Sequence, residues 1–412
     1  MEVSQKITTA ETLSSLIKST SHYNVLTLDK FISAGIPNRK NEEYKYSLPE
    51  KYLSKITAIA KEEKLNALHL KNIESVLSKY FGFCNYLVLN NGFVSKKDIS
   101  VTGLTLKTTD ARTEVVSDDA FVHLNNAAQN VGYQIEISAD YKNESPLVII
   151  NYTNQSNIIS NGYVNIHTSK NVNANIFEIN IVEDGAKDFF VNNLVNISVG
   201  ANAHLTYYKL QDAGYNDTQL STVIVSQEND STFDTNTVSL SGLWIRNNLS
   251  ILLNGKNCTT HLNGLYFGKN TFHIDNHTLV DHRQPHCNSN QLYKGVLFDK
   301  SEAVFNGKIY VQLDAQKTNA YQSSKNILMS DDASVNAKPQ LEILADDVKC
   351  SHGSSTGKID KQALFYLQAR GIGVESAKNL LLKAFVSDAL HTIQVETYRE
   401  ALEERIASEL GI

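Results

Sequence analysis

A thiol and an imidazole lie two residues apart, as Cys350 and His352, in the segment PQLEILADDVKCSHGSSTGKIDK (339–361). The residues before them predict a strand, on which both side chains would share one face, about 6.6 Å apart along the backbone. Thiolate sulfur and neutral imidazole nitrogen suit iron, zinc and copper. Two ligands cannot hold a metal alone, so the pattern predicts a site completed by another molecule. The alternative is a buried structural cysteine beside a surface histidine.

A second group of candidate ligands lies upstream. Pro285 excludes a normal helix at the end of this stretch, whereas His273, Asp275 and His277 would share one face of a strand. This spacing leaves two interpretations open, a metal site or a polar surface that needs no metal. The residues concerned are five of the twelve histidines, His261, His273, His277, His282 and His286, with Cys258 and Cys287 close by.

The elements that must position these residues change character along the chain. Residues 1–80 show helical spacing in pieces, and Gly35 followed by a proline at 37 ends the second piece. From about 86 to 350 the apolar residues alternate, which is typical of half-buried strands. Examples of these alternating segments are GYVNIHTS, NANIFEINIV, LVNISV, HLTYYKL and TVIVSQ.

The strands are separated by recurring corners rich in Gly, Asn and Asp. Most corners lie about 27 to 33 residues apart, with a gap of about 44 before the fourth, and such repeats indicate a solenoid. The many asparagines favour a parallel β-helix, here taken as right-handed, in which side-chain amides hydrogen-bond between coils. An antiparallel sandwich is the alternative. The corners begin at Gly200, Asn229, Gly255, Asp299 and Asp331.

After Gly357 the spacing is helical again. Asp360 is expected to cap the helix KQALFYLQAR, and Gly371 to end it in the left-handed conformation. Two further amphipathic helices follow. These helices would either cap the end of the solenoid or dock another subunit. We therefore expect an N-terminal helical region (1–85), a β-helix core (86–357) and a C-terminal helical region (358–412).

Composition narrows the classes of function. A formal charge of −6 without a basic run argues against nucleic acid as the main partner. The polar N-terminus and the lack of a long apolar run predict a soluble, cytoplasmic protein that does not bind membranes. The four cysteines are far apart, as expected for reduced thiols. The segment GIGV (371–374) lacks the ending of a phosphate loop, so no nucleotide site is expected.

Long motifs resemble the SufD family, scaffold subunits of the SUF iron–sulfur cluster assembly system. The segment IPNRKNEEYKYSL (36–48) is similar to a weaker family motif, with Tyr44 in place of its tryptophan. Where the sister scaffold SufB carries its cluster cysteine, this chain has YQSSK (321–325), and serine is a poor cluster ligand. The strong motifs are ADDVKCSHG (345–353), ALFYLQARGI (363–372), PHCNSNQLYKGVL (285–297) and VFNGKIYV (304–311).

The resemblance implies a β-helix scaffold without catalytic activity. It implies that His352, and with less weight Cys350, lies at the contact with SufB, where a nascent cluster forms. It also implies that the ABC-type ATPase SufC docks on the C-terminal helices. No cofactor is expected on the isolated chain, and iron or an iron–sulfur cluster would be held transiently in the complex. The alternatives are a carbohydrate-active β-helix enzyme, which needs paired carboxylates in an aromatic-lined groove, and a structural homodimer.

Overall fold

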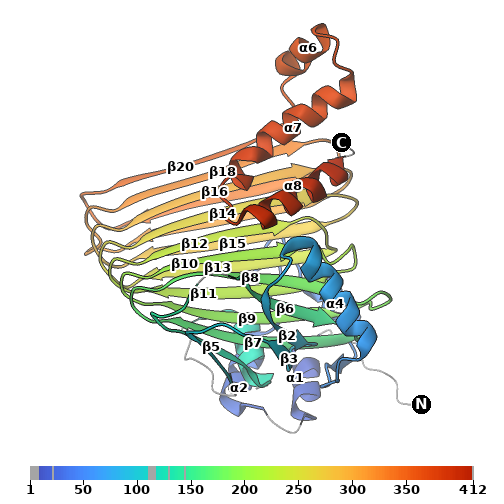
Figure 1. Ribbon diagram of the computed structural model, residues 1–412, viewed down its shortest axis with the longest axis vertical. Helices are drawn as coiled ribbons and strands as arrows, with labels where there is room; N and C mark the ends of the chain where they lie inside the picture. The colour runs from blue at the N-terminus through green and yellow to red at the C-terminus, as the bar shows by residue number, and fades with distance from the viewer. Residues whose placement is uncertain (1–8, 21–22, 110–116, 129, 143–144, 411–412) are drawn as a thin grey trace.

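The computed structural model describes residues 9–20, 23–109, 117–128, 130–142 and 145–410. Within these residues, two ten-stranded sheets face each other and form a parallel β-solenoid (Figure 1). Sheet A contains β1 (Ala58–Ile59), β4 (Leu104–Thr109), β5 (Gly132–Ile137), β7 (Ile158–Thr168), β9 (Phe190–Val199), β11 (Thr218–Gln227), β13 (Trp244–Leu253), β15 (His273–His282), β17 (Glu302–Val311) and β19 (Ser334–Ile343). Sheet B contains β2 (Asn85–Asn90), β3 (Phe93–Asp98), β6 (Leu147–Thr153), β8 (Asn173–Val182), β10 (His204–Gln211), β12 (Thr232–Ser239), β14 (Thr259–Gly268), β16 (Asn288–Leu297), β18 (Asn319–Leu328) and β20 (Lys349–Gly357).

From β6 onward the chain alternates between the two sheets, so each coil consists of one strand from each. Neighbouring strands pair in parallel, and the predicted parallel β-helix is confirmed. The expected amide ladders are also present. Asn202 Nδ2 donates to Asn171 Oδ1 at 2.8 Å, and Asn319 Nδ2 donates to Asn288 Oδ1 at 3.0 Å. These bonds join one coil to the next.

The corners explain the uneven spacing found in the sequence. One column of corners precedes the strands of sheet B, and Asn202, Asp230, Asn257 and His286 take the left-handed conformation there. Asp299 belongs to the other column, which precedes the strands of sheet A. The gap of about 44 residues therefore reflects a change of column. The corner that the sequence did not reveal is at His286, because histidine is not a residue type that indicates a turn.

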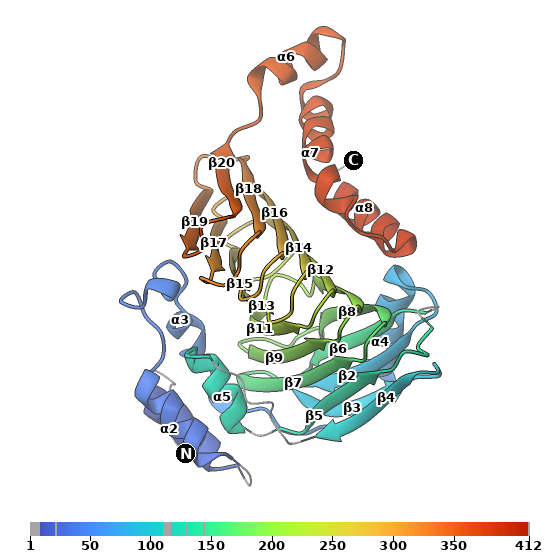
Figure 2. The same ribbon diagram turned by 90° about the vertical axis from the view of Figure 1, so that its left-hand side faces the viewer.

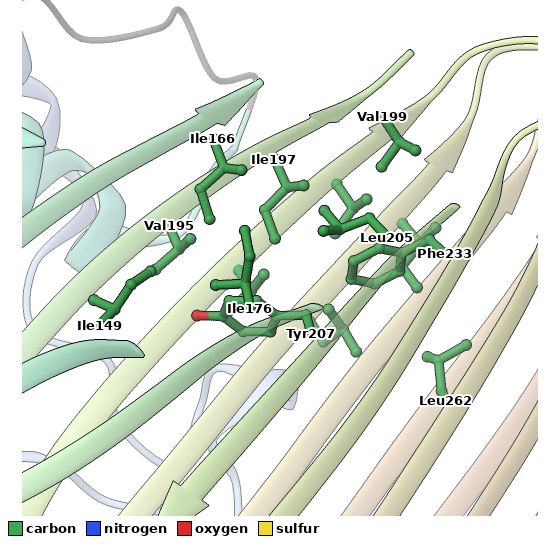
Figure 3. Packing of buried hydrophobic residues seen from close by; sticks show 14 of the residues in the cluster. Ile149, Ile166, Ile176, Val195, Ile197, Val199, Leu205, Tyr207, Phe233 and Leu262 are labelled. Carbon is green, nitrogen blue, oxygen red and sulfur yellow. The ribbon is translucent and has the colours of Figure 1, made fainter. Parts of the chain in front are cut away.

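Apolar side chains from alternate positions fill the space between the sheets. Ile166, Val195 and Ile197 from sheet A meet Ile149 and Ile176 from sheet B (Figure 3). All five are at most 2% exposed. Burial of each such side chain contributes about 1.5–3 kcal/mol, so a core this long stabilises the solenoid along most of its length.

Helices cover the outer faces of the two sheets. Near the N-terminus, α1 (Ala10–Lys18), α2 (Val25–Ala34) and α5 (Ala120–Ala128) lie outside sheet A, and η1 (Glu42–Tyr44) and α3 (Glu50–Leu53) follow α2 along the chain. Figure 2 shows α2, α3 and α5 on this side of the solenoid. The helix α5 interrupts a region expected to contain only strands. As predicted, α2 ends at Gly35, which has a φ of 71°.

Three helices follow the last strand. α7 (Val374–Leu390) and α8 (Glu396–Leu410) pack, with α4 (Ala67–Tyr80), on the outer face of sheet B. α6 (Lys361–Ala369) extends away from the solenoid (Figures 1 and 2). Asp360 caps α6 and Gly371 follows it with a φ of 84°, as predicted. Among the described residues, no helix is long and apolar enough to cross a membrane.

Candidate functional site

Cys350 and His352 lie on β20, the last strand of sheet B. They pair in register with Ala320 and Gln322 of β18, whose side chains are buried in the solenoid. Both candidate residues therefore continue columns of inward-facing residues, and the predicted shared face is confirmed. Among the described residues, no strand pairs with the other edge of β20, so this edge is free at the end of the solenoid.

The two side chains differ in their surroundings. Cys350 is half-buried and packs against a small apolar cluster that includes Val311, Ala320 and Ala345. Burial raises the pKa of the Cys350 thiol, which therefore favours its protonated form. His352 is exposed, in keeping with a residue that reaches solvent or a partner. The imidazole is accordingly the more accessible ligand of the two.

Gln322, the register neighbour of His352, was not singled out in the sequence. Its Nε2 donates to Gln291 Oε1 at 2.7 Å on the preceding coil, whereas its own Oε1 is buried without a hydrogen-bond partner. Metal-bound imidazoles are normally oriented by an acceptor on their other nitrogen. Gln322, on the coil before His352, is a suitable candidate for this acceptor.

The serines of the segment 321–325 do not form a ligand set. Ser324 is fully buried, and Asn326 Nδ2 donates to its Oγ at 3.4 Å. Ser323 is the register neighbour of Gly353 on β20. Among the described residues, no three His, Cys, Asp or Glu side chains come together in a way that could hold a metal ion.

Two of the histidines of β15 bind the N-terminal segment. His273, Asp275 and His277 share the outer face of this strand, as predicted. His273 Nε2 lies 3.0 Å from Ser47 Oγ, and His277 Nδ1 lies 3.1 Å from Glu43 Oε2. The structure thus accounts for these histidines through contacts within the protein.

Arg246 on β13 is the centre of this contact. Its Nη1 donates to Asp275 Oδ2 at 2.5 Å and to the Glu43 carbonyl at 2.8 Å, and its guanidinium carbon lies 3.7 Å from the centroid of the Tyr44 ring. Tyr44 in turn donates to Asp119 Oδ2 at 2.7 Å. Burial alone would raise the pKa of Asp275, but His277 and Arg246 hold it well below its usual range. Arg246 carried no signal in the sequence.

The C-terminal helices present a second exposed surface. Phe365 and Tyr366 on α6 are 71% and 56% exposed, and α6 has no buried residue. Large apolar residues this exposed on an isolated helix are typical of protein contacts. By contrast, α7 and α8 bury Leu382, Val386 and Leu402 against sheet B. Among the described C-terminal residues, α6 therefore carries the most exposed large apolar side chains.

The geometry is thus a solenoid with an uncovered last coil and a projecting helix. The family model described as the SUF system FeS cluster assembly, SufBD core domain, matches residues 148–385, more than half of the chain. The chain belongs to the SufBD family. Its matched region begins at the second residue of β6 and ends within α7, so it includes the last coil and α6.

Individual relatives agree with this assignment. The chain is 29% identical over 402 residues to the iron–sulfur cluster assembly protein SufD of Escherichia coli, covering 93% of this chain and 91% of that protein. It is 27% identical to the chloroplastic protein ABCI7 of Arabidopsis thaliana, over 88% of this chain and 80% of that one. A SufBD family protein of Mycobacterium leprae is 34% identical over 43% of this chain and 47% of its own length.

Proposed function

We propose that this chain is a scaffold subunit without catalytic activity that pairs with a SufB-type scaffold and a SufC-type ATPase. The observation that carries the proposal is the uncovered last coil, on which Cys350 and His352 lie. A nascent iron–sulfur cluster, the cargo of the assembly, would form where this coil meets the sister scaffold. Family membership and the similarity to SufD support this function.

The two ends of the solenoid differ in a way that supports pairing at the last coil. At the N-terminal end, β3 and β4 pair antiparallel with their neighbours and carry Lys96, Lys97 and Lys107. Lysines on an edge strand discourage pairing with another chain. At the other end, β19 and β20 offer long free edges, and Leu344 just after β19 is 49% exposed. An unprotected edge is a template for β-pairing.

His352 would supply an iron ligand across this interface, with Gln322 orienting its ring. Cys350 would contribute less, because its thiol is partly buried and favours the protonated form. The remaining ligands would come from the sister scaffold.

The energy input would come from the ATPase, which would bind at α6. Its exposed Phe365 and Tyr366 offer an apolar contact, while α7 and α8 tie α6 to the solenoid. Lys294 of β16 donates to Asp388 Oδ2 of α7 at 2.6 Å, and Arg405 of α8 donates to Asp212 Oδ2 at 2.7 Å. Movement of the ATPases on ATP binding would thereby reach the scaffold and reshape the interface.

The carbohydrate-enzyme alternative is less well supported. A groove of about 690 Å³ lies on the outer face of sheet A, with Glu43, Asp118 and Asp119 among its lining residues. No Phe, Tyr or Trp is among the described residues that line it, whereas this alternative requires a groove lined with such aromatic residues. The free edges of the last coil would also allow two copies of this chain to pair. The test below distinguishes such a homodimer from the complex with the sister scaffold.

The proposal is tested by co-expressing the chain with SufB-type and SufC-type proteins and purifying on a tag carried by this chain. We expect a stable complex with both. The double variant Ile343→Lys with Leu344→Lys should lose the SufB-type scaffold but keep the SufC-type ATPase, because both residues are exposed beside the free edge. Leu68→Lys, at an exposed residue of α4, is the matched control. Recovery of a homodimer without the sister scaffold would overturn the proposal.

A further inference from the structure

Two cysteines are stacked in neighbouring coils at one corner of the solenoid. Cys258 directly precedes β14 and Cys287 directly precedes β16, whose first residues pair in register. The backbone N–H of Asn288 donates to the Cys258 carbonyl at 2.8 Å, which fixes the two cysteines one above the other. Both are fully buried, and both are free thiols.

The two sulfur atoms point toward the same place. Cys258 Sγ lies 3.2 Å from the Gly255 carbonyl oxygen, and Cys287 Sγ lies 3.4 Å from the same oxygen. Thiols on neighbouring coils therefore lie within hydrogen-bonding distance of one carbonyl group. A further carbonyl oxygen, that of Glu228, lies 3.1 Å from Cys258 Sγ. The pair therefore lies among partial negative charges, which favour a bound cation.

The rest of the corner column explains how this pair is held. Ser231 and Thr318 occupy the same position in the coils before and after, and both are fully buried. Small side chains of different types therefore fit at this corner position of successive coils, and packing alone does not require two adjacent thiols. Sulfur differs from the hydroxyls of the column in its affinity for soft metals.

The number of ligands decides which metal would fit. Structural zinc takes four protein ligands, and no group of three ligands occurs among the described residues. Monovalent copper is soft and is stable between two thiolates in a line. Two metal–thiolate bonds of about 2.3 Å span about 4.6 Å, close to the strand spacing of about 4.8 Å. We propose that Cys258 and Cys287 form a buried two-coordinate site for Cu(I).

Binding would exchange protons for the metal. Each thiol loses its proton to solvent and its sulfur becomes a thiolate ligand, while copper stays monovalent throughout. The route to the site is short, because Lys256 and Asn257 of the covering turn are exposed. This inference concerns a corner on the coils of β14 and β16, two strands before β20, and does not rest on the proposed scaffold function.

The test uses the full chain, reduced and anaerobic, titrated with Cu(I) against the chromophoric chelator bicinchoninate. Cys350→Ser is used as the background so that the last coil does not contribute. We expect one equivalent of copper that competes with the chelator, and X-ray absorption showing two sulfur neighbours. Cys258→Ser and Cys287→Ser should each lose this equivalent, whereas Cys84→Ser, at a half-buried lone cysteine, should keep it.

Serine is tolerated at both positions, since Ser231 already occupies this column, and circular dichroism would verify folding. The proposal is overturned if the folded Cys258→Ser protein keeps its copper equivalent. It is equally overturned if the background protein binds none, or if Zn(II) displaces Cu(I) at equal concentration.

Discussion

The guanidinium carbon of Arg246 lies 3.7 Å from the centroid of the Tyr44 ring and joins the N-terminal segment to the solenoid. Arg246 is buried, and its charge is balanced by Asp275. An aromatic ring such as that of Tyr44 can stack on an arginine. This contact and the hydrogen bond from Arg246 to the Glu43 carbonyl hold the N-terminal segment on sheet A.

Arg246→Ala is expected to destabilise the chain by about 3–5 kcal/mol, because it leaves the buried Asp275 carboxylate without its main partner. Tyr44→Phe keeps the ring and loses only the hydrogen bond to Asp119, at a cost of about 1–2 kcal/mol. Urea unfolding followed by tryptophan fluorescence, from Trp244, measures both. A smaller loss for Arg246→Ala than for Tyr44→Phe would contradict the importance of the ion pair.

Asp217 should make stability depend on pH. Burial raises its pKa to about 7, although the hydrogen bond from Gln219 lowers it. The folded pKa thus exceeds the unfolded value of about 3.9, so stability falls as pH rises from about 4 to about 7. Asp217→Asn removes this loss and should be more stable than the wild type at pH 8 by about 2–4 kcal/mol. Parallel pH profiles of urea midpoints for the two proteins would refute the prediction.

His352→Ala should leave folding and complex formation almost unchanged, because the side chain is exposed on the last strand. Cluster formation on the assembled complex should fall by at least tenfold, as measured by visible absorption during reconstitution. His167→Ala, at an exposed histidine of β7, is the control. Cys350→Ser is expected to have a smaller effect. If the His352→Ala complex forms clusters at the wild-type rate, His352 is an ordinary surface histidine.

Phe365→Ser with Tyr366→Ser should weaken ATPase binding at least tenfold without lowering stability, since both side chains are exposed. Calorimetric titration with the SufC-type protein measures this effect, and Phe83→Ser, also exposed, is the control. Removal of residues 360–412 would be a poorer test. It would also uncover Phe177 and Tyr208, which pack against Tyr398 of α8. Unchanged affinity in the double variant would place the ATPase elsewhere.

The isolated chain is expected to be colourless and to bind iron below one equivalent after anaerobic reconstitution. It should also lack ATPase activity. The reason is that the described residues offer no three-ligand group, and the sequence lacks a phosphate loop. Iron analysis and a phosphate-release assay give the answer. A stable cluster at full occupancy on this chain alone would be incompatible with the scaffold proposal.

Local patterns were sufficient for much of the fold. Alternating apolar residues determine which side chains enter the core, so the shared face of Cys350 and His352 followed from their spacing alone. Asp360 and Gly371 marked the ends of α6 because a cap and a left-handed residue act within a few residues of the helix. The family itself followed from long motifs, which the matched family model confirms.

The sequence did not show what covers each surface. The C-terminal helices were equally compatible with capping the last coil, yet α7 and α8 lie along sheet B and leave β19 and β20 open. His273 and His277 could have been metal ligands, but they meet the N-terminal segment. Which surfaces are buried, and which residues each side chain contacts, depend on contacts between residues far apart in the chain. Arg246 with Tyr44, and Cys258 with Cys287, become neighbours only when the coils stack in register.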